Sequence, residues 1–459
     1  GLPQPPDPDT VIARVVNSNS PEVSQFSSSS AYLEKLMSNI LWTQRSNMIG
    51  IPTDCPQRDE RLGWTGDALT FSQTAIFNMD MAGFYRKWMQ DMRDDQAADG
   101  RFPDVAPNPM NVASEITPAF QENLLDGSPA WADAGIVIPW RAYENYGDTE
   151  LLKVQYEAAK RWIEFVHSRN PDLLWKNSRG LDPGDWLNGD TLIEPGWPRE
   201  GATIPHLVFA TAYFAHSTEL LSKMAAAIGR QDDARHYAEL FSQIKSAFNQ
   251  AFVKPDGRIV GDTQSAYALA LDFDLLPENA RWQAVDHLLE GLQRYHGHPS
   301  TGIHGTRSLM LELTAYGHND EAYQVLNLHS FPSWGYMVDM GATTVFERWD
   351  GYVADRGFQN HTAMNSLNHV VLGAVGEWIW KNVVGLAPDD SAPGYQHFTV
   401  YPRVGGNLTW AKGTYESVRG RIAIDWKIAN GVFALDLVVP PNVSATVHLP
   451  ASDPSKIQE

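Results

Sequence analysis

A helical hydrophobic period runs through most of this chain and constrains its fold more than any other feature. In the segment 31–44, AYLEKLMSNILWTQ, apolar residues recur at the amphipathic helical spacing as Leu33, Leu36, Met37, Ile40 and Leu41. Such a stripe must be buried against another element. Further helices are predicted over 67–97, 130–146, 150–168, 204–228, 232–252, 264–272, 279–294, 303–316, 319–328 and 361–384.

About a dozen helices with no strand-like intervals between them predict a mainly α domain. No sequence repeat of fixed period is found, which argues against a regular solenoid. A closed ring of helical hairpins fits the helices better. In such a ring we expect the functional residues to come from loops at one end.

The sequence changes character near residue 388, after a linker rich in Pro, Gly and Asp. RIAIDWKI (421–428) alternates apolar and polar residues, Asn430-Gly431 is a strong two-residue hairpin signal, and FALDLVV (433–439) alternates back. We therefore expect a small antiparallel β-sandwich over 388–459, with its last strands beyond this chain. The barrel is expected over 31–387.

The first thirty residues are rich in Pro, Ser, Asn and Asp. VIARVV (11–16) is predicted to be a strand left from an upstream β domain, followed by a polar linker. We therefore assign 1–30 to a linker and remnant strand.

The charge and the cysteine content exclude several function classes. A formal net charge of −20 argues against binding to nucleic acid or to an anionic membrane surface. No apolar run of transmembrane length occurs. A single cysteine excludes intrachain disulfides and cysteine-rich metal sites. A neutral ligand fits this composition, and with no signal segment in this chain the compartment stays open.

The segment IPTDCPQRDERLGWTGDA (51–68) concentrates charge beside an aromatic residue. Two prolines disfavour a helix at its start, whereas TGDA favours a helix start, so the charged residues belong to a loop. Arg58 and Arg61 can keep a carboxylate ionised, while a carboxyl beside Trp64 would have its pKa raised by desolvation. That pairing suits acid catalysis at a glycosidic bond, and a buried structural ion-pair network is the alternative.

Two residues near these carboxylates leave alternatives open. Cys55 is either a nucleophile or, more simply, a small residue packed in a loop. Glu347 lies far along the chain between Phe346 and Arg348, in the segment 333–352. It is either a general base flanked by aromatic residues or the salt-bridge partner of Arg348.

Other candidate groups are isolated along the chain. They are Trp131 in GSPAWADA, Trp186 in DPGDWLNGD and His369 in MNSLNHVV. A single histidine on a helix is more often a core residue than a site residue. DPGDWLNGD has acids and a glycine, but it lacks the twelve-residue calcium-loop pattern, so we predict no metal site. The common phosphate-loop, dinucleotide, zinc-protease and nucleophile-elbow motifs are absent.

One long motif resembles a known family. DCPQRDERLGWTGDA is similar to the signature segment of the α-L-rhamnosidases of glycoside hydrolase family 78. Further matching segments follow in the family's order over roughly 30–385, and they are RFPDVAP, GSPAWADAGIVIPWRAYENYGD, GDWL, TQSAYALAL, TGIHGT, FPSWGYM, GATTVFERWDG and MNSLNH. The resemblance implies an (α/α)6 barrel followed by a C-terminal β-sandwich, with further β domains upstream.

The resemblance also implies a reaction, which is hydrolysis of terminal α-L-rhamnosyl residues with inversion and without a cofactor. Glu60 takes the place of the general acid and Glu347 that of the general base, with an expected separation of roughly 6.5–9.5 Å. The residues implied to bind or enclose the sugar are Asp54, Arg58, Asp59, Trp64, Asp67, Trp131, Trp186, Trp334 and His369. For Asp59, sugar binding and ion pairing with an arginine stay open.

Two other functions remain possible interpretations of the sequence alone. One is a helical-barrel glycosidase for another sugar, and the other is a non-catalytic or truncated sugar-binding remnant. An assay against a panel of aryl glycosides separates them. The aglycone, the linkage and the oligomeric state are not encoded in any motif found here.

Overall fold

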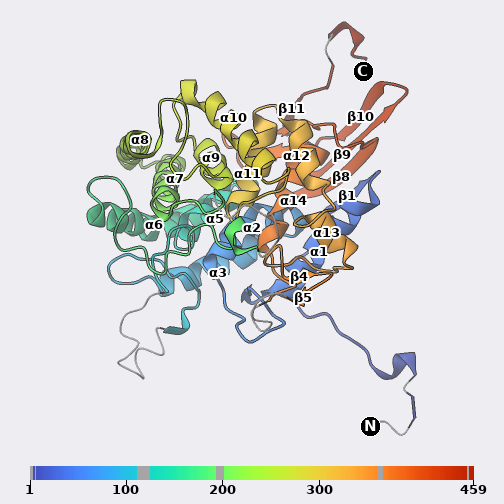
Figure 1. The fold of residues 1–459 in the computed structure, drawn as a ribbon, viewed down its shortest axis with the longest axis horizontal. Helices are drawn as coiled ribbons and strands as arrows, with labels where there is room; N and C mark the ends of the chain where they lie inside the picture. Colours follow the sequence, from blue (N-terminus) through green and yellow to red (C-terminus); the bar gives the residue numbers. More distant parts are fainter. Residues whose placement is uncertain are drawn as a thin grey trace.

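The computed structural model describes residues 4, 5, 7–110, 125–192, 201–358, 365–451 and 454–458. A helical domain stands beside a domain of strands, and the N-terminal segment reaches away from both (Figure 1). None of the helices that the structure describes combines the length and the apolar character needed to cross a membrane.

One set of helices is buried on nearly all sides. Every residue of α2 (Thr65–Asn78) is buried, which is the pattern of a helix enclosed by others. The other inner helices are α5 (Ala134–Tyr146), α7 (His206–Ala227), α9 (Gln264–Asp272), α11 (Gly305–Ala315) and the final helical stretch η5 (Val371–Ala374), α14 (Val375–Trp378) and η6 (Ile379–Val384).

A second set buries only one stripe each and covers the first. In α3 (Ala82–Asp94) the buried residues are Tyr85, Trp88, Met89 and Met92, at helical spacing. The other outer helices are α1 (Ala31–Asn47), α6 (Thr149–Arg169), α8 (Gln231–Phe252), α10 (Glu278–Arg294) and α12 (Asn319–Leu326). Within the described residues, outer and inner helices alternate along the chain, as a ring of helical hairpins requires.

The ring is closed by contacts between its first and last hairpins. Thr74 of α2 donates a hydrogen bond to the carbonyl of Ala374 at 3.1 Å, and the backbone N–H of Glu377 donates to Thr74 at 2.9 Å. This closure brings the loop before α2 next to the segment that follows α13 (Trp334–Asp339). The predicted barrel is therefore confirmed.

Some predicted helix boundaries differ from the structure. The segment 67–97 is two helices, because Met79 adopts an extended backbone that ends α2. The helix predicted over 361–384 begins only at Val371, because 365–370 form no helix, and 359–364 lie outside the described residues. The short elements not predicted are η1 (Pro8–Thr10), β2 (Met48–Ile49), β3 (Ile51–Pro52), η3 (Gly189–Thr191), α13, β4 (Tyr352–Val353), β5 (Gly357–Phe358) and η7 (Pro454–Lys456).

The C-terminal domain contains two sheets. The first has the antiparallel order β1-β8-β9-β10, with β1 (Ser24–Ser28), β8 (Trp410–Ser417), β9 (Gly420–Ala429) and β10 (Val432–Val438). The second has the order β11-β7-β6, with β6 (Leu386–Pro388), β7 (His397–Val400) and β11 (Ser444–Val447). The expectation of antiparallel pairing holds except for β11, which runs parallel to β7 because the chain crosses from one sheet to the other before it.

The predicted Asn430-Gly431 hairpin is confirmed. Both residues have positive φ, at 53° and 76°, as a type I′ turn requires, and they join β9 to β10. The inward residues of β9 include Trp426, whose indole N–H donates to the carbonyl of Val383 at 2.8 Å. This contact docks the sheet on the last helix of the barrel.

The N-terminal segment differs from its prediction. Residues 11–16 form no strand, and Val11, Ile12, Val15 and Val16 are exposed. The strand of this region is instead β1, which pairs with β8 and lies beside it in Figure 1. Among the described residues no strand pairs with 11–16, whereas β8 pairs with 24–28 along its edge.

Candidate active site

The charged motif folds as a loop that is closed by its own carboxylate. The carboxylate of Asp54 accepts a hydrogen bond from the backbone N–H of Leu62 at 2.8 Å, and the backbone N–H of Asp54 donates to the carbonyl of Leu62 at 3.0 Å. Arg61 turns the chain with a φ of 54°, and Asn47 at the end of α1 donates to the carbonyl of Asp54 at 2.7 Å. The loop is thereby fixed at the mouth of the barrel.

The loop and the segments opposite it surround a cavity of about 240 Å³. All predicted site residues except Asp59 and Trp334 line it. The full lining is Asp54, Arg58, Glu60, Trp64, Asp67, Trp131, Leu181, Pro183, Trp186, Ile303, Glu347, His369 and Val371. These residues lie far apart in sequence, and barrel closure brings them together.

Each carboxylate oxygen of Glu60 accepts a short hydrogen bond. The indole N–H of Trp64 donates to Oε1 at 2.8 Å, and Nη2 of Arg58 donates to Oε2 at 2.6 Å. Burial raises the pKa of Glu60, but the bond from Trp64 and the charge of Arg58 outweigh burial, so the pKa is lowered. The expectation that desolvation by Trp64 raises this pKa is therefore wrong, because Trp64 presents its N–H to the carboxylate.

Asp54 is the carboxyl that holds a proton more tightly. Burial raises its pKa to about 6, and the charges of Asp67 and Glu60 add to the shift, against opposing contributions from Cys55 and His369. The site therefore contains one carboxyl that ionises easily and one that does not, as expected. The carboxyl beside Trp64 is the one that ionises easily, which is the reverse of the sequence-based expectation.

Glu347 faces Glu60 across a shared arginine. Its backbone N–H donates to the carbonyl of Ser366 at 3.0 Å, and its carboxylate Oε2 lies 3.6 Å from Nη2 of Arg58. The same nitrogen is 2.6 Å from Oε2 of Glu60, so these two oxygens are separated by at most the sum, about 6.2 Å. Arg348 is bonded to Asp350 at 2.5 Å, so the ion partner predicted for Glu347 is replaced by Arg58.

His369 forms a buried ion pair at the cavity wall. Its Nε2 lies 2.6 Å from Oδ1 of Asp67, and Nδ1 lies 3.1 Å from the hydroxyl of Ser366. Burial lowers the pKa of His369, but the charges of Glu347 and Asp67 and the bond to Asp67 raise it to about 9. The imidazole is therefore a cation at neutral pH, next to Glu347.

Tryptophans provide the aromatic part of the wall. Trp131 is buried and packs its edge against His304, with ring centroids 4.9 Å apart. A Cβ on Gly66 would lie only 2.6 Å from the Trp131 ring, so this ring position requires a glycine in the first turn of α2. Trp186 is 45% exposed and therefore forms the rim of the cavity.

Sequence reasoning missed the apolar members of the wall. They are Leu181, Pro183, Ile303 and Val371. The first two share a loop with Trp186, which was their only signal. Asp185 anchors that loop by accepting hydrogen bonds from the backbone N–H groups of Gly302 and His304 at 2.8 and 2.9 Å, so its carboxylate is used structurally.

Two predicted site residues lie elsewhere. Asp59 is fully exposed and pairs with Arg61 at 3.3 Å, because the loop turns its side chain outward. Trp334 is completely buried behind the site, where its indole N–H donates to the carbonyl of Leu372 at 2.9 Å and its ring packs on Trp349. Neither position supports the predicted contact with a sugar.

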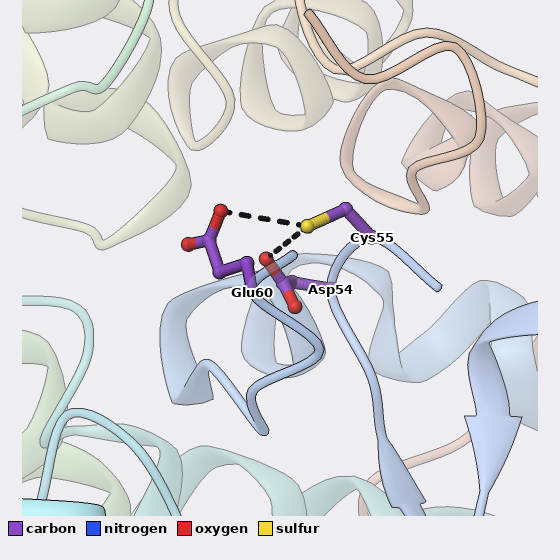
Figure 2. A group of neighbouring side chains, drawn as sticks. All are labelled: Asp54, Cys55 and Glu60. Carbon is purple, nitrogen blue, oxygen red and sulfur yellow. Dashed lines mark hydrogen bonds between the residues drawn. The ribbon is translucent and has the colours of Figure 1, made fainter. Parts of the chain in front are cut away.

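One group among the described residues has donor atoms close enough to hold a metal ion. Asp54, Cys55 and Glu60 offer ligand atoms within 4.8 Å of one another (Figure 2). Arg58 already donates to the thiol at 3.0 Å and to Glu60 at 2.6 Å. The positive charge that a metal ion would bring is therefore supplied by an arginine.

Comparisons with known proteins place the chain in a family. Residues 21–383 match the bacterial alpha-L-rhamnosidase 6 hairpin glycosidase domain, and residues 385–459 match the bacterial alpha-L-rhamnosidase C-terminal domain. An alpha-L-rhamnosidase of Streptomyces avermitilis is 41% identical over 458 residues, which are 100% of this chain and 42% of that protein. An alpha-L-rhamnosidase of Formosa agariphila is 36% identical over 99% of this chain and 47% of its own length.

Solved structures agree with these relatives. The Streptomyces avermitilis alpha-L-rhamnosidase complexed with L-rhamnose matches with a TM-score of 0.88 at 40% identity, over 96% of this chain and 40% of that one. The alpha-L-rhamnosidase from Dictyoglumus thermophilum matches with a TM-score of 0.87 at 34% identity, over 99% of this chain and 48% of that one. This chain thus spans less than half the length of these relatives, and it belongs to the bacterial alpha-L-rhamnosidase family of six-hairpin glycosidases.

Proposed function

We propose that this chain hydrolyses terminal α-L-rhamnosides with inversion, with Glu60 as general acid and Glu347 as general base. The observation that supports the proposal most is the placement of Arg58 between these two glutamates in one cavity. An acid and a base that face each other across a sugar-sized space are what glycosidic hydrolysis requires. The two carboxylate oxygens that flank Nη2 of Arg58 are at most about 6.2 Å apart, which is below the roughly 6.5–9.5 Å expected between the carboxyl groups of an inverting pair, so the anomer of the product decides between inversion and retention.

The proposed reaction assigns a separate proton transfer to each glutamate. Glu60 donates its proton to the leaving oxygen, while Glu347 takes a proton from a water on the opposite face of the sugar ring. In this structure Trp64 and Arg58 lower the pKa of Glu60. A bound sugar whose hydroxyls engage Arg58 and displace water would weaken that effect and raise the pKa of Glu60. Asp54 is a second carboxyl in the same cavity, and burial already raises its pKa to about 6.

The shape and chemistry of the wall support a deoxy sugar as substrate. Rhamnose carries a methyl group at one end and hydroxyls around the rest of the ring. Leu181, Ile303 and Val371 offer the methyl an apolar wall, and Asp54 and Asp67 offer acceptors for hydroxyls. An apolar cavity with a few placed polar groups is typical of a small-molecule site.

The test is hydrolysis of an aryl α-L-rhamnoside within a panel of aryl glycosides. We expect the rhamnoside alone to be cleaved. With a leaving group that departs poorly without a proton, such as an unsubstituted phenol, E60Q and E347Q should each lower kcat by about 10²–10⁴-fold while circular dichroism stays unchanged. D59N is the matched control, because Asp59 lies in the same motif but is exposed, and its carboxylate pairs with Arg61 outside the cavity. A wild-type rate in either glutamine variant contradicts the assignment.

A further inference from the structure

Cys55 is the only cysteine of the sequence and is completely buried against the cavity residues. Neither proposed proton transfer uses its thiol. Burial, followed by the hydrogen bond to Asp54, raises the pKa of Cys55 well above its usual range, so the thiol keeps its proton. It is therefore not a nucleophile, because the thiolate is the reactive form.

The thiol nevertheless contacts three side chains to which the proposed function assigns roles. It donates to Oδ2 of Asp54 at 2.7 Å, it lies 3.4 Å from Oε2 of Glu60, and it accepts a hydrogen bond from Nε of Arg58 at 3.0 Å. Figure 2 shows the sulfur between the two carboxyl groups, with a dashed line to each. A residue that only fills space in a loop would not need polar contacts with all three of these side chains.

The contact with Arg58 orients the guanidinium group. Nε of Arg58 is used by the sulfur, whereas Nη2 is directed at Oε2 of Glu60, with Oε2 of Glu347 at 3.6 Å. A guanidinium group is planar, so fixing Nε restricts where Nη2 can lie. The thiol therefore helps to set the position of Nη2 of Arg58 relative to Glu60 and Glu347, the two proposed proton-transfer groups.

We propose that Cys55 is a positioning residue, whose thiol holds Asp54, Arg58 and Glu60 in one fixed arrangement. The expected effect of Cys55 on kcat/KM rests on the proposed function, whereas its expected effect on the pKa values of Asp54 and Glu60 does not. The other charged groups that face this unit are Asp67 from α2, and Glu347 and His369 from the segment after α13.

The test compares variants that lack the thiol hydrogen bonds with one that keeps them. C55A removes the bonds and the bulk, C55V removes the bonds and keeps bulk, and C55S retains a donor and an acceptor. We expect kcat/KM for an aryl α-L-rhamnoside to fall at least about tenfold in C55A and C55V, and to recover to within about threefold of wild type in C55S. If C55A does not fold, C55V carries the comparison.

The pH dependence has a defined sign. The single thiol proton of Cys55 lies between Oδ2 of Asp54 at 2.7 Å and Oε2 of Glu60 at 3.4 Å, and it lowers the pKa of both carboxyls. Without this proton both pKa values rise, so the basic limb of the kcat/KM profile, where the general acid loses its proton, moves to higher pH in C55A and C55V. The same shift is measured without substrate by ¹³C NMR titration of the side-chain carboxyls, with D54N and E60Q to assign the signals.

S217A is the matched control, because Ser217 is a buried donor to another buried carboxylate, Asp133, at 2.7 Å, away from the cavity lining. It should lower the melting temperature without moving the pH profile. Wild-type carboxyl titration and wild-type kcat/KM in C55A and C55V, with only a lower melting temperature, would overturn the proposal. If the wild-type chain cleaves no rhamnoside, the proposed function is refuted. The positioning role still stands in that case if the pKa values of Asp54 and Glu60 are higher in C55A than in wild type.

Discussion

Nε2 of His369 lies 2.6 Å from Oδ1 of Asp67, and both side chains are buried in the wall of the candidate active site. The two residues are 302 positions apart, so this pair links the first inner helix to the last part of the barrel. It also places a positive charge beside Glu347, because the pKa of His369 is raised to about 9. One contact thus contributes to both ring closure and site electrostatics.

The first prediction concerns stability in H369N. The pKa of His369 is about 9 in the folded chain against 6.5 in the unfolded chain, so its stabilisation is full below pH 6.5 and disappears as pH rises through 9. We expect the difference in unfolding free energy between wild type and H369N to be larger at pH 6.5 than above pH 9 by on the order of 3 kcal/mol. Urea unfolding across this pH range measures it.

H329N provides the control for that experiment. His329 forms a similar pair with Asp339 at 2.8 Å, but on the protein surface. Exposed pairs contribute little to stability, so H329N should follow the wild-type curve at every pH. A wild-type-minus-H369N gap that stays constant from pH 6.5 to 9 contradicts the buried ion pair.

The second prediction concerns Gly66. An added Cβ would come within 2.6 Å of the Trp131 ring, so G66A must push that ring out of its place in the cavity wall. Misplacing a substrate-positioning group by about 1 Å can cost about 10²-fold in rate, and we expect a loss of that size in kcat/KM. Steady-state kinetics on an aryl α-L-rhamnoside measures it.

G83A is the paired substitution, because Gly83 lies in α3 with nothing within 4 Å of an added Cβ. It should leave kcat/KM unchanged and raise stability by up to about 1 kcal/mol, since alanine is the better helix former. Equal kinetics in G66A and G83A would mean that the position of Trp131 does not matter for turnover.

The third prediction separates the acid from the base by leaving group. A nitrophenolate departs readily without protonation, whereas an alkoxide needs a proton from Glu60. E60Q should therefore lose much less activity on a 4-nitrophenyl rhamnoside than on an alkyl rhamnoside, while E347Q should lose similar activity on both. Parallel losses for E60Q on the two substrates would remove Glu60 from the role of general acid.

The sequence specified those features that depend on local pattern. The helical period of α1 and the Asn430-Gly431 turn were predictable because both follow from backbone geometry over a few residues. The motif loop was predictable because two prolines mark its start and TGDA marks the beginning of the next helix. The family resemblance supplied the link between Glu60 and Glu347, which no local pattern contains.

The features that escaped prediction depend on orientation or on distant contacts. Asp54 and Asp59 share one motif, yet the first is buried in the cavity wall and the second is fully exposed. The pKa of Glu60 depends on whether Trp64 presents its indole N–H or an apolar edge, and the residue types alone do not specify this orientation. The polar strand β1 has no hydrophobic pattern of its own, and its partner β8 is almost four hundred residues away.

The central claim is that Glu60 and Glu347 hydrolyse an α-L-rhamnoside by a single displacement with inversion. Proton NMR of the first sugar released from an aryl α-L-rhamnoside, recorded before mutarotation, tests it most directly. Because the water deprotonated by Glu347 attacks the face opposite the leaving group, the account predicts β-L-rhamnose as the initial product. Release of α-L-rhamnose first would show a double displacement and contradict the assignment of Glu347 as a base acting on water.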